Sequence, residues 1–332
     1  MSIICNSQIT GIGAYIPEMV VHSRDLMREI KSAQLGYDER LFERATGIRE
    51  RRFTTEEETY TMMSVEASHQ AIVDAGIDPA DIDFTIYCGI DKDVAEPSLA
   101  HEISNILGAK KAICFDINNA CLGLLNGLSI ANAYLASGAA ENVLICTAEK
   151  SSRITLDVMR QIKEEGTKAA LKRLLGAFTI GDAGGAFVVS KAKEGLGAQH
   201  MNFFTDSSIS HLCYYKREGK KIEFVMDMEN ISAAMVEWHS RFLDDTYNQL
   251  AWQPSEINKV FCHQVGAKPH KFMAELAQVS LERVPTTYDR FANMTSATFA
   301  VNMSINRPQP GEKILMLGAG SGCSGCQIGM QF

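Results

Sequence analysis

The chain has 332 residues, of which 46% are hydrophobic and 22% are charged, and its net charge is −8. This length and apolar content predict one large or two medium packed units, and the negative charge without a basic stripe excludes a general nucleic-acid-binding protein. Nine scattered cysteines, with no predicted signal peptide or continuous membrane-spanning segment, indicate a reduced cytoplasmic protein.

Short apolar strands alternate with amphipathic helices along the whole chain, which predicts an α/β fold. The predicted strands of the first half cover residues 84–88, 112–117, 142–146 and 185–189. Those of the second half cover residues 222–226, 259–262, 313–317 and 326–332. This recurrence is compatible with two similar lobes, residues 1–190 and 191–332, although no internal sequence repeat is evident.

Cys121 lies between the predicted strand 112–117 and an apolar helix with leucines at helical spacing up to Leu135. Backbone N–H groups and the positive end of the helix dipole favour a thiolate there and predict a thiol pKa below about 8.5. A buried structural cysteine is the alternative, because free cysteines are common in protein cores. Position alone does not separate the two.

Residues 156–175 form a basic helical segment interrupted by two glutamates. Its cations are Arg160, Lys163, Lys168, Lys172 and Arg173. One interpretation is a docking surface for an acidic acyl carrier protein, and the other is an ordinary solvated helix.

Two later segments supply a histidine and an amide at the ends of elements. A short buried strand, 259–262, ends at His263, and Pro269 then lies in the first turn of an amphipathic helix that runs to about Val279. Asn293 lies in a polar loop that leads into another helix. Each residue alone is more often structural, but their joint placement with a cysteine indicates an active site.

Four further motifs occur in order along the chain, at residues 9–17, 45–51, 181–186 and 318–322. With them, the chain resembles the β-ketoacyl-acyl-carrier-protein synthase III branch of the thiolase superfamily over essentially its full length. The resemblance implies the five-layered αβαβα thiolase-like fold with two pseudo-duplicated lobes. It also implies that Cys121 is the acyl-accepting nucleophile and that His263 and Asn293 complete a Cys-His-Asn site.

The implied reaction loads an acyl group from a thioester onto Cys121. A Claisen condensation with a second thioester, malonyl or acyl, then yields a β-ketoacyl product. Attack on a thioester passes through a tetrahedral intermediate, so N–H donors must face the oxyanion, and the backbones of Cys121, Ala319 and Gly320 are the candidates. His263 and Asn293 would hydrogen-bond the second thioester and stabilise its enolate.

The resemblance further implies coenzyme A or acyl-carrier-protein thioesters as substrates, no resident cofactor, and a homodimer, with a heteromer also open. Two other functions remain open. One is acyl transfer to an oxygen or nitrogen acceptor, or thioester hydrolysis, by the same nucleophile. The other is a non-catalytic partner subunit of a heteromeric synthase. A metal site is not expected, because the Cys323–Cys326 pair lacks further ligands at metal spacing.

Some positions depart from the synthase III pattern at places that concern the substrate. Arg44 stands one residue before the usual arginine position, and Gly266 replaces an asparagine that contacts pantetheine in that family. Met294 is one of several methionines suited to a pliable acyl tunnel, with core filling as the alternative. Arg44, Gly266 and Met294 are therefore secondary candidates for substrate contacts.

Glu96 lies where the synthase III family usually has an apolar residue that reaches into the neighbouring subunit's acyl pocket. A glutamate there resembles the condensing enzymes of long-chain olefin and related secondary-metabolite biosynthesis, which implies a base acting across the dimer interface. The alternative is that Glu96 simply precedes a helix near Ala100. Its negative charge is then favourable beside the positive N-terminal end of that helix.

Overall fold

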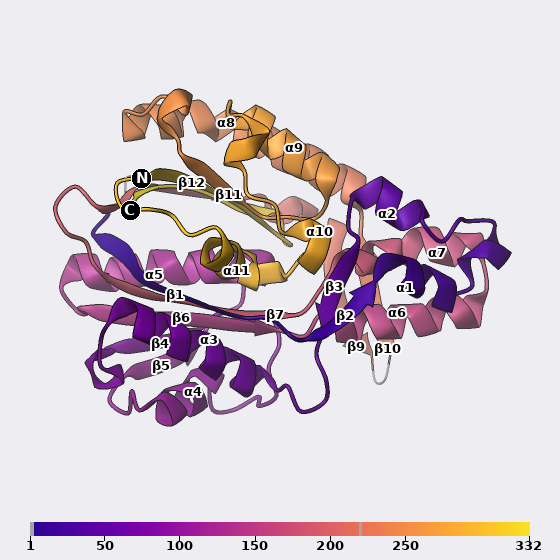
Figure 1. The fold of residues 1–332 in the computed structure, drawn as a ribbon, viewed down its shortest axis with the longest axis horizontal. Coiled ribbons are helices and arrows are strands. Elements are labelled where there is room, and N and C mark those ends of the chain that lie inside the picture. Colours follow the sequence, from indigo (N-terminus) through magenta and orange to yellow (C-terminus); the bar gives the residue numbers. More distant parts are fainter. Residues whose placement is uncertain (1–2, 219–220) are drawn as a thin grey trace.

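Two β-sheets form the frame of the molecule (Figure 1), in a computed structural model that describes residues 3–218 and 221–332. The five-stranded sheet has the order β1-β7-β6-β4-β5, and the four-stranded sheet has the order β11-β12-β13-β8. The first consists of β1 (Ser7–Tyr15), β7 (Ala183–Lys191), β6 (Asn142–Glu149), β4 (Phe84–Tyr87) and β5 (Ile113–Asp116). The second consists of β11 (Lys259–Cys262), β12 (Lys313–Gly320), β13 (Ser324–Gln331) and β8 (Gly197–Thr205).

Each sheet has a parallel edge from which a candidate residue follows. Strand β5 pairs in parallel with β4, and β11 pairs in parallel with β12, whereas β7 and β13 pair antiparallel with both of their neighbours. The chain leaves the carboxyl end of β5 toward Cys121 and the carboxyl end of β11 at His263. The change of sheet falls between Lys191 and Gly197, next to the expected lobe boundary at residue 190.

Helices form three layers around the two sheets (Figure 1). The outer ones are α3 (Tyr60–Ala75) and α4 (Leu99–Leu107) on the first sheet, and α8 (Met228–Leu250) and α9 (Ala267–Leu276) on the second. Two helices, α5 (Gly123–Ser137) and α11 (Thr298–Ile305), lie between the sheets and share one hydrophobic core with strands of both. This arrangement is the predicted five-layered αβαβα fold.

The glycines of the motif at residues 9–17 let α3 lie directly on β1. A Cβ atom at Gly11 would stand 1.9 Å from the carbonyl oxygen of Ala71, and one at Gly13 would stand 1.9 Å from that of Ala67. No side chain fits at such distances, so this motif permits close contact between helix and sheet.

A peripheral layer of four helices and two small two-stranded sheets packs beside the main sheets around its own core (Figure 1). It contains α1 (Ser23–Glu29), α2 (Leu41–Thr46), α6 (Ser152–Glu165), α7 (Lys168–Leu174), β2 (Met19–His22), β3 (Glu50–Phe53), β9 (Cys213–Glu218) and β10 (Lys221–Met226). The predicted strand 222–226 is present as part of β10, but it pairs with β9 instead of joining the second sheet. It does so because Ile222 and Phe224 pack into the core of this layer.

Short elements connect these parts of the fold. They are η1 (Ser32–Leu35), η2 (Pro79–Asp81), η3 (Ala120–Leu122), η4 (Leu175–Thr179), η5 (Ser207–Leu212), η6 (Pro254–Glu256), η7 (Leu281–Arg283), α10 (Tyr288–Phe291) and η8 (Thr295–Ala297), where η marks a 3₁₀ turn. Two of them, η3 and η8, directly precede the central helices α5 and α11 and contact each other.

One helical stretch, Ala120–Ser137, is long and apolar enough to cross a membrane, and 56% of it is buried inside the fold. It comprises η3 and α5, whose Leu124, Leu125 and Leu128 belong to the core shared by both sheets. Its apolar composition is therefore explained by its central position.

Candidate active site

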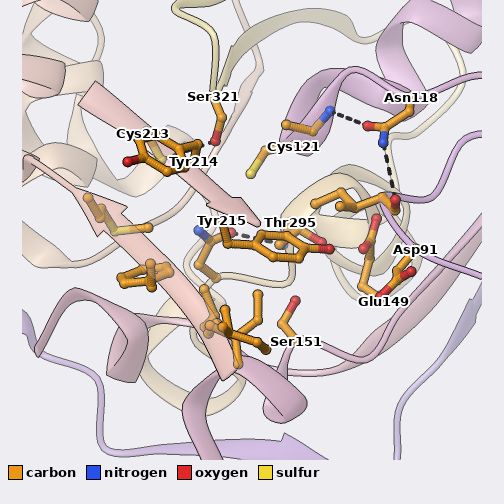
Figure 2. A pocket seen from close by; sticks show the side chains of 18 of the residues that line it. Asp91, Asn118, Cys121, Glu149, Ser151, Cys213, Tyr214, Tyr215, Thr295 and Ser321 are labelled. Atoms are coloured by element: carbon orange, nitrogen blue, oxygen red, sulfur yellow. Dashed lines mark hydrogen bonds between the residues drawn. The ribbon is translucent and has the colours of Figure 1, made fainter. Parts of the chain in front are cut away.

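Cys121 lies in the η3 turn, directly before α5. The turn begins with Ala120 at φ 49°, and its backbone N–H donates to Oδ1 of Asn118 over 3.0 Å (Figure 2). The glycine-rich end of β12 packs against this turn, since a Cβ atom at Gly320 would stand 3.1 Å from the backbone nitrogen of Leu122. The backbone at Gly320 thus lies beside the turn that carries Cys121, where the expected oxyanion role of Ala319 and Gly320 requires it.

A cavity of about 690 Å³ opens at Cys121 (Figure 2). Its apolar wall is formed by Ile90, Ile154, Ile180, Ile222, Phe224 and Met226. Three tyrosines also line it, namely Tyr60, Tyr214 and Tyr215, and charged groups are present in Asp91, Glu149, Lys150, Arg153 and Arg217. A space of this size and composition suits an organic ligand with an apolar part.

Asn293 also lines the cavity, and backbone contacts determine its position. Its N–H donates to the carbonyl of Thr179 over 2.8 Å, and its own carbonyl accepts from Gly181 over 2.9 Å. Its side-chain Oδ1 accepts from the N–H of Thr295 over 2.8 Å. Because Oδ1 is engaged, the amide NH₂ is left to hydrogen-bond the thiol of Cys121.

The thiol of Cys121 has a raised pKa in this structure. Burial is the main cause, and the nearby Cys213 thiol and Glu149 carboxylate add to it. Hydrogen bonds from the backbone of Cys121 and from Asn293 act in the opposite direction but do not prevail. The predicted lowering of the pKa by the helix start is therefore wrong, because desolvation outweighs the local dipole.

His263 continues the ladder of β11, since its N–H donates to the carbonyl of Leu317 over 3.1 Å. Its side chain is buried, and burial lowers its pKa to about 4, so the ring is neutral near physiological pH. Its Nδ1 has no hydrogen-bond partner among the described residues. His263 is not one of the residues that line the cavity, and among the described residues no hydrogen bond joins its Nδ1 to Cys121 or Asn293.

Glu96 is exposed, in the loop between β4 and α4, and does not line the cavity of its own chain. Helix α4 begins at Leu99, so Glu96 stands two residues before the N-cap Ser98, which is the position that the alternative interpretation expects. The hydrogen bonds at this N-terminus go to Asp116, whose carboxylate accepts from the N–H groups of Leu99 at 2.9 Å and Ala100 at 3.1 Å. The carboxylate of Glu96 is thus left on the surface beside α4.

None of the three secondary candidates for substrate contacts lines the cavity. Arg44 is an exposed residue whose guanidinium pairs with Asp38 over 3.2 Å. Gly266 lies at φ 142°, where a Cβ atom would stand 2.9 Å from the carbonyl oxygen of Thr46. Met294 is fully buried in a core cluster, which corrects the tunnel interpretation in favour of core filling.

The site also contains Glu149 and Cys213, which sequence reasoning missed. Glu149 is the last residue of β6 and is 2% exposed, and Cys213 begins β9, with its thiol 3.1 Å from the hydroxyl of Ser321. The available signal for Glu149 was a carboxylate three residues beyond the apolar strand 142–146. No local signal marked Cys213.

The part of the chain that the structure describes contains no group of side chains arranged to bind a metal ion. Over residues 3–218 and 221–332, no three His, Cys, Asp or Glu side chains are grouped so that they could hold a metal ion. Cys323 and Cys326 are both free thiols.

Comparison with known proteins places this geometry in a family. Residues 115–207 match the family model of 3-oxoacyl-[acyl-carrier-protein] synthase III, and residues 248–329 match that of its C-terminal part. A β-ketoacyl-[acyl-carrier-protein] synthase III from Methylococcus capsulatus is 30% identical over 328 residues, which cover 95% of this chain and 96% of the relative. The chain belongs to the 3-oxoacyl-[acyl-carrier-protein] synthase III family. As a member of the synthase III family it is a condensing acyltransferase.

Further relatives support the same assignment. The synthase III of Bacillus pumilus is 26% identical over 331 residues, which cover 98% of this chain and 99% of the relative. The crystal structure of the Aquifex aeolicus synthase III has a TM-score of 0.83 at 24% identity, covering 98% of this chain and 100% of the other. A histidine variant of OleA from Xanthomonas campestris has a TM-score of 0.89 at 20% identity and covers 98% of both chains. At these identities the two structures show the shared thiolase-like fold.

Proposed function

We propose that Cys121 accepts an acyl group from a thioester and that the acyl-enzyme then condenses with a second thioester, malonyl or acyl, to give a β-ketoacyl product. The observation that carries this proposal is that Cys121 and Asn293 line one cavity, where the Asn293 amide favours the thiolate form of Cys121, in a chain of the synthase III family. Attack by the thiolate expels the carrier thiol, which leaves with the proton that Cys121 gave up.

Asn293 and His263 would then act on the second thioester. The neutral imidazole of His263 has a ring nitrogen without a hydrogen-bond partner among the described residues, and the NH₂ of Asn293 has a second proton to donate besides the one directed to Cys121. Two neutral donors aimed at one carbonyl oxygen stabilise the negative charge of an enolate. The same two residues would serve condensation whether the enolate arises by loss of carbon dioxide or by proton removal.

We also propose a homodimer that pairs through β5, with Glu96 near its interface. Strand β5 is the edge strand of its sheet, and Ile113 in it is 58% exposed. Asp116, at the end of β5, binds Lys92 over 2.5 Å and the start of α4, so the loop that carries Glu96 lies at this same edge. An unpaired edge with an exposed isoleucine favours pairing with a second copy.

If Glu96 serves as a base across that interface, Glu96→Gln should spare acylation of Cys121 and suppress condensation with acyl donors that keep their α-protons. Condensation with malonyl donors should remain, because loss of carbon dioxide needs no base. Sedimentation of the wild type tests the dimer separately. A monomer, or equal loss with both donor types, would exclude a role for Glu96 across a dimer.

Coenzyme A or carrier-protein thioesters are proposed as the substrates, with no resident cofactor. In α6 and α7, much of the predicted basic surface is already engaged in the ion pairs Arg160–Asp157, Lys163–Glu29 and Arg173–Glu165. This supports the solvated-helix interpretation of the segment. Each of the nine cysteines is a free thiol, which supports a reducing compartment such as the cytoplasm.

The deciding experiment is the intact mass of the protein after exposure to a panel of acyl-coenzyme A and acyl-carrier thioesters. We expect one acyl adduct, mapped to Cys121 and absent in Cys121→Ala, followed by a β-ketoacyl product once the second thioester is added. Cerulenin, which is bound in a solved structure of Xanthomonas campestris OleA, is a second probe for the same mass measurement. An adduct on Cys88, Cys146 or Cys262 would overturn the assignment, and release of free acid alone would indicate a hydrolase.

A further inference from the structure

Glu149 is a buried carboxylate with hydroxyl partners, and it forms no ion pair among residues 3–218 and 221–332. It is 2% exposed, and its Oε1 accepts from Ser296 Oγ over 2.5 Å and from Thr147 Oγ1 over 3.0 Å. The two hydroxyls lie 2.6 Å apart, which closes a triangle of buried polar groups. Burying a carboxylate without a counter-ion costs free energy, so this arrangement calls for a reason beyond packing.

The triangle fastens the η8 turn, which follows Asn293. Ser296 belongs to η8, and Thr295 in the same turn supplies the N–H that orients Asn293 Oδ1. The backbone of Asn293 is tied to η4 and Gly181 on its other side. Glu149 and Thr147, at the end of β6, therefore hold the side of the turn that faces the first sheet, and Asn293 depends on both attachments for its position.

Glu149 also acts on Cys121 through its charge. Both side chains line the cavity, and the carboxylate opposes ionisation of the thiol. The carboxylate likewise opposes the ionisation of Tyr60, Tyr87, Cys88 and Tyr215, which come from several elements. The cations that line the same cavity are Lys150, Arg153 and Arg217. Burial raises the pKa of Glu149 to about 7, so both of its protonation states are populated near neutral pH.

We propose that Glu149 is a positioning residue of this active site, which holds the η8 turn so that Asn293 meets the second substrate and whose negative charge restrains ionisation of Cys121. The inference rests on the proposed condensation. The two effects act on different steps, because the anchor serves condensation and the charge serves the nucleophile. They can therefore be separated by substitutions that remove one and keep the other.

The charge is removed by Glu149→Gln, whose amide oxygen can still accept from both hydroxyls. Alkylation of Cys121 by iodoacetamide, followed by peptide mapping across pH, reports the ionisation of the thiol without any substrate. We expect the pH profile of Glu149→Gln to move toward lower pH, with a rate at neutral pH roughly three- to ten-fold above wild type, equivalent to a shift of up to about one pKa unit. A merely structural role would not raise thiol reactivity, and an unchanged profile would overturn the charge effect.

The anchor is removed by Ser296→Ala, with Thr147→Val as a second variant in case the first does not fold. Both keep the carboxylate, so we expect near-normal acylation of Cys121 but condensation from the preformed acyl-enzyme slowed by about ten- to a hundred-fold, as for misplaced catalytic groups. Wild-type condensation in both folded variants would overturn the positioning role. If the wild type itself acylates but never condenses, the proposed function fails, whereas the iodoacetamide profiles still test Glu149.

Discussion

The two central helices begin in the same way but are held by different forces. Helix α5 follows η3, which opens with Ala120 at φ 49°, and α11 follows η8, which opens with Thr295 at φ 49°. Cys121 lies within the first turn, and Asn293 lies just before the second. Figure 1 shows both helices in the layer between the sheets, and their turns contact each other.

The first turn is held by backbone packing, and the second by buried hydrogen bonds. The glycine-rich end of β12 lies against η3, whereas η8 is fastened through Ser296 to Glu149. The nucleophile should therefore be sensitive to added volume, and the amide should be sensitive to lost polar groups and to pH. Four predictions follow this contrast, from the largest expected effect to the smallest.

Asn293→Asp should remove the donor function of the Asn293 amide while leaving the η8 turn intact. The new carboxylate can still accept from the N–H of Thr295, but it has no NH₂ to offer. Loss of one such donor costs about 10²- to 10³-fold in rate, so condensation should fall by that factor and acylation by much less. Single-turnover rates of the two steps measure this, with His263→Ala as the parallel variant. Equal loss of both steps would mean that these residues serve to activate Cys121.

Gly320→Val should disturb the η3 turn that carries the nucleophile Cys121. Its side chain would meet the backbone of Leu122, where even a Cβ atom stands at 3.1 Å, and would displace the turn of Cys121. A displacement of about 1 Å lowers rates by about a hundred-fold, and here acylation itself should be lost. Gly320→Ala is the graded control and should lose less. Full acylation by a folded Gly320→Val protein would disprove the packing argument.

Glu149 and His263 should give the protein opposite responses to pH. The pKa of Glu149 is raised from 4.5 to about 7, so its contribution to stability is present below 4.5 and is lost as the pH rises through 7. The pKa of His263 is lowered from 6.5 to about 4, so its contribution is present above 6.5 and is lost as the pH falls toward 4.

Urea unfolding of wild type and Glu149→Gln between about pH 5 and pH 8 tests the first half of this contrast. We expect the wild type to lose on the order of 1 to 3 kcal/mol relative to the variant across that range, because one pKa unit corresponds to about 1.4 kcal/mol. Parallel curves for the two proteins would show that the carboxylate is not destabilised by burial.

Ala120→Gly should have the smallest effect. Glycine adopts a positive φ without strain, so the substitution should stabilise the fold by up to about 1 kcal/mol, measured by thermal unfolding. Thr295→Gly should not, although its φ is the same, because it also removes a side chain that is only 5% exposed. Destabilisation by Ala120→Gly would mean that the methyl group of Ala120 packs usefully.

Local patterns were sufficient to predict the strands and the residues at their ends. Strands β4, β5, β6, β7, β11, β12 and β13 appear where apolar runs were expected, because such a run bounded by polar residues is itself the signature of a buried strand. The five layers and the family came from ordered motifs spread over the chain. Which catalytic role belongs to Cys121, His263 and Asn293 stays a prediction for the experiments above.

The sequence pattern could not predict which strand pairs with strand 222–226, because tertiary packing decides this. Its apolar residues identify a strand, but only the peripheral core around α6 and α7 determined that it pairs with β9. The same holds for Met294, whose methionine side chain suited a tunnel and a core equally well.

By itself, the sequence determined the alternation of strands and helices and the cysteine, histidine and asparagine at element ends, because these depend on neighbours within a few residues. Only the tertiary structure decided the proton affinities and the anchoring of the site. Glu149 is buried by Ser296, which is 147 positions away along the chain, and no window around residue 149 contains that contact. The raised pKa of Cys121 has the same origin, since desolvation comes from segments brought together by folding and exceeds the lowering by the Cys121 backbone and Asn293.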